Sequence, residues 1–211
     1  MNGLSLFSGI TPAQQRQMEQ CFHPLSSSYG AGETIMTYSS SPVRLGTLLS
    51  GRAHLSSLDA EGRENRLEEL EEGDVFGEMF ILPLENQAYW VEADTECQIM
   101  FIDYPHLIKR CENACPHHSQ LVDNLFRITA RKTQAMAMHI HVLSQRSLRQ
   151  KLLAYFSFLR LLTGSDSFLL PLNYRALADY LGADRSAMTR ELGKMKREGL
   201  LKTEGRRITL L

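Results

Sequence analysis

The chain has 211 residues, of which 43% are hydrophobic and 22% are charged. This composition is typical of a globular protein with room for two modest domains, and it argues against a disordered or fibrous chain. No basic and apolar leader begins the sequence, and its most apolar window, residues 152–162, is shorter than a membrane span. Four cysteines are too few for a disulfide framework, so we expect a cytoplasmic protein without membrane contact.

Charge is distributed unevenly along the chain. Residues 1–145 carry 10 basic and 18 acidic side chains, whereas residues 146–211 carry 13 basic and 6 acidic side chains. An acidic larger part and a basic smaller part are expected when only the smaller part approaches a polyanion. The charge pattern therefore favours nucleic-acid binding by the C-terminal third.

The first half predicts a short helix followed by an antiparallel sheet domain. Thr11 and Gln14 form a capping-box pattern, which predicts a helix that ends near Phe22. Between residues 28 and 103, glycines separate short apolar runs, a spacing typical of a β-roll or barrel. Residues 59–62 predict a hairpin turn. The expected strands are residues 34–36, 45–49, 53–58, 67–70, 75–76, 90–93 and 98–102.

Residues 117–144 contain neither glycine nor proline and predict one long helix. Side chains along it keep a heptad-like spacing, and such helices commonly pair with a second copy of themselves. The alternative is a helix that packs only on its own domain. The predicted seam comprises Leu121, Leu125, Ile128, Lys132, Ala135, His139 and Val142, and we assign the dimer interface to its members other than Lys132.

The C-terminal third predicts a helix-turn-helix flanked by strands. Polar residues 144–147 form the expected hinge, a helix covers 148–162, and strands cover 167–172 and 207–211. Asn173 is a suitable N-cap for the first helix of the pair, and Gly182 suits a left-handed turn after it. Asp184 or Ser186 can begin the second helix. Strands around a helix pair predict a winged helix.

The second helix of the pair has one apolar and one polar face. Met188, Leu192 and Met195 recur at helical spacing and are expected to pack inward. Guanidinium and hydroxyl groups on the other face suit the base edges of a DNA major groove, although a plain surface hairpin shares the pattern. The expected base-reading residues are Arg185, Ser186, Thr189 and Arg190. The expected phosphate contacts are Lys194, Lys196, Arg197, Arg206 and Arg207, with Lys202 beside them.

The order of roll, long helix, hinge and winged helix resembles the Crp/Fnr family of bacterial transcription regulators. The resemblance rests on several motifs in their order and spacing. They are Gly32-Glu33-Thr34-Ile35, Leu49-Ser50-Gly51, the run from Glu72 to Glu78, Val91-Glu92-Ala93, and the run from Leu177 to Ala187. Together they extend from about Leu6 to Leu211.

The resemblance implies an α+β protein with three parts. These are an N-terminal antiparallel β-roll of the jelly-roll, cyclic-nucleotide-binding type (1–116), a dimerisation helix and hinge (117–145), and a winged helix-turn-helix domain (146–211). It also implies a homodimer on a palindromic double-stranded DNA operator, controlled by an effector in the roll, with RNA polymerase as a partner if the protein activates. Many members have glutamate where this chain has Ser186, and serine is the less selective base reader.

The effector site departs from the cyclic-nucleotide pattern. Gly77 and Glu78 match the ribose-binding pair of that branch, but Gln87 and Ala88 stand where its phosphate-binding arginine and serine belong. A buried phosphate without a guanidinium lacks its bidentate partner. Cyclic AMP is therefore not the expected effector, and Gly77-Glu78 has an alternative role in holding a turn of the roll.

Metal cofactors are also not expected. An iron–sulfur cluster needs several N-terminal cysteines, and here only Cys21 is N-terminal. Cys111 and Cys115, followed by His117-His118, leave open a small zinc or redox site, and seven histidines leave haem open. No histidine lies between Gly77 and Ala88, where the carbon-monoxide-sensing branch has its haem ligand.

A small organic molecule or anion is the favoured effector. Its expected pocket comprises Gly77, Glu78, Met79, Gln87, Ala88, Lys132 and Thr133. The alternatives are a ligand-sensing module that controls a protein partner and a haem or redox sensor of the same family. An enzyme is not expected, because the chain carries no catalytic or phosphate-loop motif.

Overall fold

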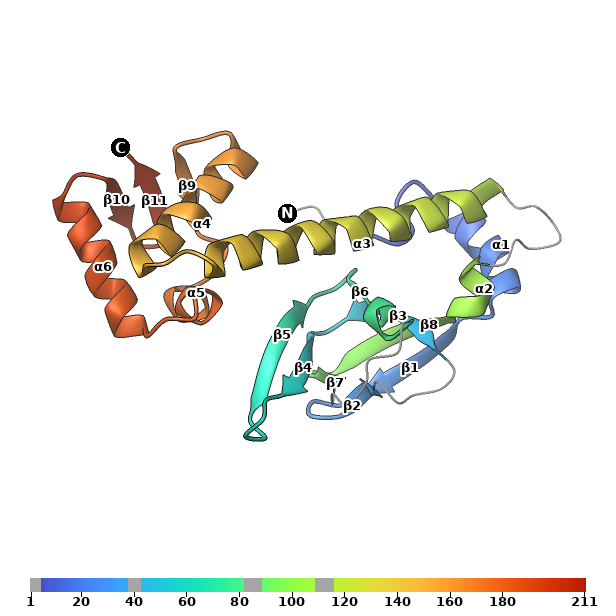
Figure 1. Cartoon of the computed structure of the whole chain (residues 1–211). Coiled ribbons are helices and arrows are strands. Elements are labelled where there is room, and N and C mark those ends of the chain that lie inside the picture. Colours follow the sequence, from blue (N-terminus) through green and yellow to red (C-terminus); the bar gives the residue numbers. More distant parts are fainter. Residues whose placement is uncertain (1–4, 38–42, 82–88, 109–115) are drawn as a thin grey trace. The chain divides into compact units, whose positions relative to one another are not determined.

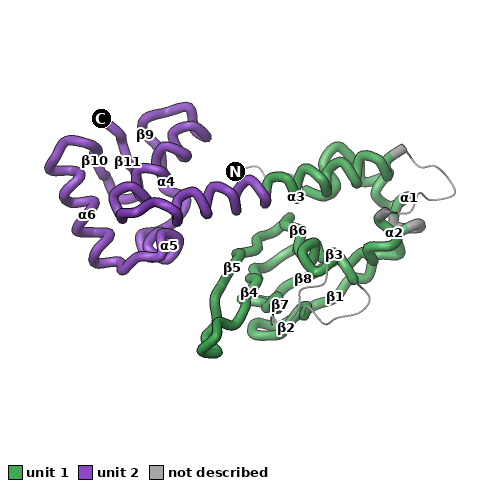
Figure 2. The backbone as a smooth tube through the Cα atoms, viewed as in Figure 1, with its two compact units in different colours: residues 1–131 green, residues 132–211 purple. Residues whose placement is uncertain are grey.

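The computed structural model describes residues 5–37, 43–81, 89–108 and 116–211. The chain forms two compact units, residues 1–131 and 132–211 (Figure 2). The division falls within the long helix α3 (Pro116–Leu143), which contributes to both units. The division at residues 116 and 145 that the sequence predicts stays a prediction.

The first unit contains two four-stranded antiparallel sheets (Figure 1). In the first sheet the order is β1 (Leu25–Tyr29), β8 (Cys97–Asp103), β3 (Arg44–Ser50) and β6 (Val75–Phe76). In the second sheet the order is β2 (Thr34–Thr37), β7 (Tyr89–Ala93), β4 (Ala53–Leu58) and β5 (Glu64–Leu70). This pair of sheets confirms the expected antiparallel roll.

Strand β8 is buried on both faces, which explains its nearly continuous apolar sequence. Ile99 and Phe101 point into the core between the two sheets. Met100 and Ile102 point to the other side, where α1 (Pro12–Phe22) and the start of α3 cover the first sheet. Successive side chains of a strand point to opposite faces, so the alternate residues of this apolar run belong to two different cores.

Several local predictions are confirmed. The amide of Thr11 donates to Oε1 of Gln14 (2.8 Å) and the amide of Gln14 to Oγ1 of Thr11 (3.4 Å), which forms the capping box of α1. The amide of Gly62 donates to the carbonyl of Asp59 (3.0 Å) in the predicted turn. Strand β1 and two short helices, η1 (Glu78–Ile81) and α2 (Tyr104–Ile108), were not predicted.

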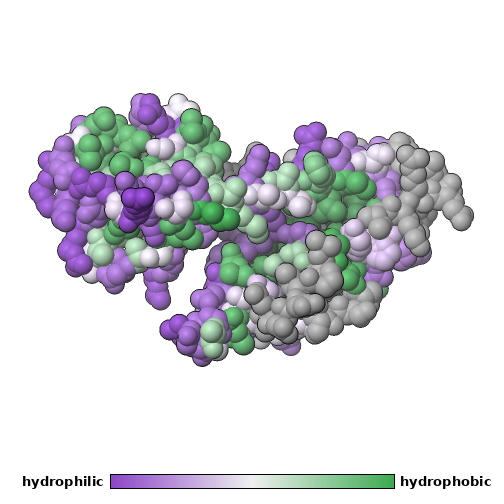
Figure 3. All heavy atoms as spheres, viewed as in Figure 1, coloured by the Kyte–Doolittle hydropathy of each residue, from purple (hydrophilic) through white to green (hydrophobic). Residues whose placement is uncertain are grey.

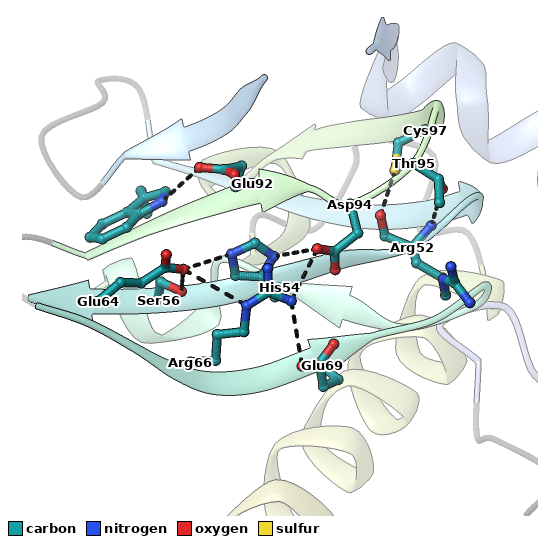
Figure 4. Close-up of polar contacts among 11 residues, drawn as sticks. Arg52, His54, Ser56, Glu64, Arg66, Glu69, Glu92, Asp94, Thr95 and Cys97 are labelled. Atoms are coloured by element: carbon teal, nitrogen blue, oxygen red, sulfur yellow. Dashed lines mark hydrogen bonds and ion pairs between the residues drawn. The ribbon is translucent and has the colours of Figure 1, made fainter. Parts of the chain in front are cut away.

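A polar cluster occupies β4 and its neighbours (Figure 4). His54 is fully buried, with Nδ1 3.1 Å from Oδ1 of Asp94 and Nε2 3.0 Å from Oε1 of Glu64. Ser56 donates to the same oxygen of Glu64 (2.6 Å), and Arg66 pairs with Asp94 (3.0 Å). Protein groups therefore satisfy the buried imidazole, and the cluster ties β4 to β5 and to the turn after β7.

Helix α3 has one side buried within its own chain. Leu121 and Ile128 belong to the core of the first unit, and Val142 belongs to the core of the second. The side-chain amide of Asn124 donates to the carbonyls of Leu6 (2.9 Å) and Ser8 (2.7 Å). Three members of the predicted seam are therefore in contact with their own chain, so their burial does not require a second copy.

The second unit combines a helical core, to which the end of α3 contributes Val142, with a small sheet. Its elements are α4 (Leu148–Thr163), β9 (Ser167–Leu169), α5 (Tyr174–Tyr180), α6 (Arg185–Arg197), β10 (Leu201–Glu204) and β11 (Arg207–Leu210). The strands pair antiparallel in the order β10-β11-β9. Phe156 and Leu177 are fully buried in its core. This arrangement confirms the winged helix-turn-helix, with β10 as a strand that was not predicted.

No helix in the described ranges is both long enough and apolar enough to cross a membrane.

Candidate nucleic-acid interface

Polar caps fix the start of both helices of the pair. The side chain of Asn173 accepts hydrogen bonds from the amides of Arg175 and Ala176, both at 3.0 Å. Oδ1 of Asp184 accepts from the amide of Ala187 (2.9 Å) at the start of α6. Gly182, between the helices, has φ of +57°, a conformation that favours glycine. The chain therefore ends α5 and starts α6 within a few residues.

The inner face of α6 anchors it to the second unit. Met188 and Met195 are fully buried, and Leu192 is 6% exposed. All three belong to the core that contains Phe156 and Leu177. Because these side chains fix the rotation of the helix about its axis, its opposite face must point outward, as the sequence predicts.

The outer face of α6 forms an open groove of about 800 Å³. The groove brings together the four predicted base-reading residues and two of the predicted phosphate contacts. Its lining comprises Asp184, Arg185, Ser186, Thr189, Arg190, Gly193, Lys194 and Arg197. The surface over α6 is mostly hydrophilic in Figure 3. Several positive charges thus line an open groove on the surface of one helix.

Hydrogen bonds order the polar groups at the start of α6. The Ser186 hydroxyl donates to Oδ1 of Asp184 (2.6 Å), and Nη1 of Arg190 donates to Oγ of Ser186 (3.0 Å). The Thr189 hydroxyl donates to the backbone carbonyl of Arg185 (2.9 Å). The Ser186 hydrogen bond, followed by the Ala187 amide, lowers the pKa of Asp184, so this carboxylate is anionic at neutral pH.

The wing adds a second basic element. Strands β10 and β11 pair from Leu201 to Leu210, and the two residues between them are Gly205 and Arg206. The Tyr174 hydroxyl donates to the carbonyl of Gly205 (2.6 Å), which ties the wing turn to the start of α5. Partial burial raises the pKa of Tyr174, so the phenol keeps its proton and remains a donor. Arg206 and Arg207 are exposed at this turn.

Lys196, also expected to contact phosphate, lines a neighbouring depression of about 250 Å³ between α5, α6 and the wing. The lining of that depression also includes Tyr174, Thr189 and Thr203. Lys202 is exposed on β10. The basic residues of α6 and the wing are thus distributed around the groove as well as along it.

Polar contacts hold α6 on the rest of the unit. Nε of Arg149 donates to Oε1 of Glu191 (2.6 Å), and both terminal nitrogens donate to Glu198. These bonds raise the pKa of Arg149, with the larger contribution from Glu198, and lower that of Glu198. Nζ of Lys151 donates to the carbonyl of Leu181 at the end of α5 (2.9 Å). Helix α4 therefore supports both members of the helix pair.

His139, expected at the dimer seam and considered as a haem ligand, contacts α5. Its Nε2 lies 2.7 Å from the carbonyl of Tyr180, so this nitrogen carries the hydrogen. The two rings stack with centroids 4.0 Å apart. In the first unit, Nε2 of His118 similarly donates to the carbonyl of Leu107 (2.7 Å). Both histidines therefore have partners within their own units.

The predicted effector residues occupy several places. Gly77 has φ of +93°, and a Cβ atom there would lie 2.5 Å from the carbonyl oxygen of Arg44. Glu78 begins η1, and Met79 packs against the core between the sheets. Gln87 and Ala88 lie outside the described residues, as do Cys111 and Cys115. Lys132 and Thr133 lie on α3 in the second unit.

Several residues of the interface were not predicted, among them Gly193 and Tyr174. Gly193 lines the groove within α6. A glycine inside a helix is destabilising by up to about 1 kcal/mol relative to alanine, so its presence in the sequence could have indicated a functional position. Tyr174 gives no such signal, because its bond to Gly205 joins residues far apart in sequence. Among the described residues, no group of three or more His, Cys, Asp or Glu side chains is placed to hold a metal ion.

Family models match both units of the chain. Residues 26–114 match the cyclic nucleotide-binding domain, and residues 150–211 match the Crp-like helix-turn-helix domain. The probable transcriptional regulator flp of Lacticaseibacillus casei is 26% identical over 84% of this chain and 80% of its own length. The cyclic AMP receptor protein of Thermus thermophilus is 26% identical over 96% of this chain and 90% of its own length.

Solved structures share the fold at lower identity. A structure of CprK complexed with OCPA has a TM-score of 0.69 at 14% identity and covers 92% of this chain and 90% of that chain. The catabolite activator protein of Thermus thermophilus has a TM-score of 0.54 at 20% identity and covers 98% and 93%. The two matched domains, their order and these relatives agree with the motifs in the sequence. The chain therefore belongs to the Crp/Fnr family of transcription regulators, with an effector-type domain followed by a DNA-binding helix-turn-helix.

Proposed function

We propose that the protein acts in the cytoplasm as a homodimer that binds a palindromic operator through α6 and responds to a small effector in the roll. The observation that carries this proposal is the outer face of α6. Arg185, Ser186, Thr189 and Arg190 line one open groove, while the opposite face of the helix is buried. Such a helix suits entry into the major groove, where side chains meet base edges.

Roles within the interface follow from the chemistry of each group. Arg185 and Arg190 present only donors and suit the paired acceptors of guanine, N7 and O6. Basic residues at the far end of α6 and on the wing suit phosphates, which fix the register of the protein on DNA. The proposed phosphate contacts are Lys194, Lys196, Arg197, Arg206 and Arg207.

An exposed face of α3 supports the dimer. Seven of its residues repeat at alternating intervals of four and three, the spacing of a two-stranded coiled coil. We call them the α3 stripe: Val122, Phe126, Thr129, Thr133, Met136, Ile140 and Leu143. Phe126 is 72% exposed and Ile140 is 67% exposed, which is unusual for large apolar side chains. We propose the α3 stripe as the contact between two copies, in place of the residues expected from the sequence.

A two-fold dimer has consequences for the DNA. Two copies of α6 related by a two-fold axis would read half-sites one helical turn apart, or about 34–36 Å. The operator would therefore be palindromic. If the regulator activates transcription, RNA polymerase is the further partner that we expect.

The proposed effector is a small organic molecule or anion other than cyclic AMP. Gln87 and Ala88 replace the arginine and serine that would bind a cyclic phosphate. The tight approach of Gly77 to the carbonyl of Arg44 gives the glycine a structural role that needs no nucleotide. Calorimetry with millimolar cyclic AMP and cyclic GMP is expected to show no submicromolar binding, and such binding would contradict this part of the proposal.

DNA selection with the full-length protein tests the proposed function. Rounds of binding to random duplexes are expected to yield a palindrome, with affinity that falls steeply between 50 and 200 mM salt, a range typical for phosphate contacts. Arg185→Ala or Arg190→Ala should relax the base preference, at roughly 1–3 kcal/mol per contact. Lys196→Ala or Arg197→Ala should weaken all duplexes about equally.

Two outcomes would contradict the proposal. Recovery of no preferred sequence by the unmodified protein would argue for a ligand-sensing module that controls a protein partner. Equal losses of affinity in the proposed base-reading variants and the proposed phosphate-contact variants, without a change in the preferred sequence, would show that α6 does not read bases.

A further inference from the structure

Chemistry fixes the direction of the hydrogen bonds around Ser186. A hydroxyl has one hydrogen to donate and two lone pairs that accept. An ionised carboxylate can only accept and a guanidinium can only donate. The hydroxyl therefore gives its hydrogen to Asp184 (2.6 Å) and receives one from Arg190 (3.0 Å). One lone pair of Ser186 remains, and this atom has no hydrogen left for a base.

Asp184 is itself held in place. The oxygen that accepts from Ser186 also accepts from the amide of Ala187 (2.9 Å), so the start of α6 fixes its position. A serine without such a neighbour can rotate its hydroxyl and either donate or accept. Because Asp184 accepts its hydrogen, the Ser186 hydroxyl has a single orientation before DNA binds.

We propose that Ser186, locked by Asp184, is an acceptor-only reading group that selects a base with a major-groove amino group and orients Arg190 beside it. This inference rests on the proposed DNA-binding function and deepens it. Adenine and cytosine present an amino group in the major groove, whereas guanine and thymine present carbonyl oxygens at the corresponding place. Ser186 therefore disfavours guanine and thymine at the base that it faces.

Arg190 gains orientation from the same contact. One of its five N–H groups is given to Ser186, which leaves others for the N7 and O6 acceptors of a guanine. A tethered guanidinium loses less side-chain freedom on binding than one that is free in solvent. Ser186 is thus a positioning residue for Arg190 as well as a reader.

The test uses the full-length protein and the palindrome that it selects from random duplexes. Each half-site position is replaced by all four base pairs, and affinities are measured for the unmodified protein, Ser186→Ala, Ser186→Thr and Asp184→Gly. The unmodified protein is expected to prefer adenine or cytosine over guanine and thymine at one position by about tenfold or more. Ser186→Ala should reduce this ratio to about twofold and weaken the neighbouring guanine preference, and Ser186→Thr should restore both.

Asp184→Gly removes the carboxylate that orients Ser186 and keeps the serine hydroxyl. Glycine is tolerated at a helix N-cap, but it has no side-chain oxygen to accept from Ser186, so the serine hydrogen is released for a base. This variant should tolerate guanine and thymine at the same position. Thr163→Val is the control outside the groove, because the Thr163 hydroxyl contacts only backbone carbonyls of its own turn, and it should leave that position unchanged. Thermal unfolding of each variant checks that the domain is folded.

Several results would overturn the inference. They are an unchanged base ratio in folded Ser186→Ala, a preference for guanine or thymine at the position that depends on Ser186, and no relaxation in folded Asp184→Gly. If the unmodified protein selects no sequence at all, the proposed function fails and this inference fails with it. If a palindrome is selected but no position depends on Ser186, only the inference fails.

Discussion

Arg149 in α4 donates two hydrogen bonds to the carboxylate of Glu198, at 2.6 and 3.0 Å, and thereby joins α4 to the end of α6. A third bond from the same guanidinium reaches Glu191 (2.6 Å). The fork of a guanidinium matches a carboxylate in two places, so the pair fixes orientation as well as distance. The C-terminal end of α6 is therefore held to α4 by one side chain.

Removal of this contact should loosen α6. Arg149→Ala and Glu198→Ala are each expected to lower the Tm and to weaken DNA binding without a change in the preferred sequence. The double variant should lose less stability than the two single losses added together, because both remove the same contact. Additive losses in a thermal-unfolding cycle would show that the pair is not coupled.

The cap of α5 gives a quantitative prediction. Asn173→Ala removes the acceptor of two backbone amides and should lower the free energy of unfolding of the second unit by about 1 kcal/mol. Asn173→Ser keeps a capping oxygen and should retain most of that stability. Denaturant titration measures both, and equal losses in the two variants would contradict a capping role.

The two sides of α3 should respond differently to a charge. Met136→Glu places a carboxylate in the α3 stripe of each copy, so light scattering should report monomers that bind palindromic DNA weakly. Ile128 is 8% exposed within its own chain, and Ile128→Glu should instead destabilise the first unit by at least about 2–5 kcal/mol. A dimer that persists in Met136→Glu would argue against the α3 stripe as the interface.

Gly77 should tolerate a side chain less well than Gly62. Both have positive φ, at +93° and +77°, so alanine is strained at either position by roughly 1–2 kcal/mol. Only at Gly77 would the new Cβ also meet backbone, the carbonyl oxygen of Arg44 at 2.5 Å. Gly77→Ala should therefore lower the free energy of unfolding clearly more than Gly62→Ala. Similar losses would mean that the clash is relieved by movement of the backbone.

Acid should weaken the cluster around His54. A hydrogen bond from Ser56, followed by one from His54, lowers the pKa of Glu64 below its ordinary value of 4.5. A group with a lowered folded pKa stabilises the protein above its ordinary pKa, and the contribution is lost as the pH falls through the folded value. Below pH 4.5 the Tm of the unmodified protein should therefore fall more steeply than that of Glu64→Gln. Parallel profiles would contradict a role for this carboxylate.

Much of the architecture could be predicted from local patterns. Glycine-bounded apolar runs located seven of the strands, and caps at Thr11 and Asn173 located two helix starts. Strand β1 could not be found in this way, because its sequence Leu-Ser-Ser-Ser-Tyr lacks an apolar alternation. Its residues pair with β8 along their whole length, so the neighbouring strand determines their structure.

Helix α3 shows where periodicity is ambiguous. Leu121, Leu125 and Ile128 repeat at heptad spacing, and so do Val122 and Phe126 one residue later. Both series fit a helical seam, and sequence alone does not tell which one faces the same chain. The choice depends on the N-terminal segment around Leu6, which packs with Leu121 in one core.

The bond between Tyr174 and Gly205 has an entropic consequence. It connects the first residue of α5 to the turn of the wing, so folding alone places Arg206 with respect to the helix pair. A hairpin held at one end only would explore many positions, and binding would have to reduce them. Here the hydrogen bond from Tyr174 restricts the wing turn before the protein binds DNA. The distance between the proposed base contacts on α6 and the proposed phosphate contact at Arg206 is therefore preorganised before DNA binds.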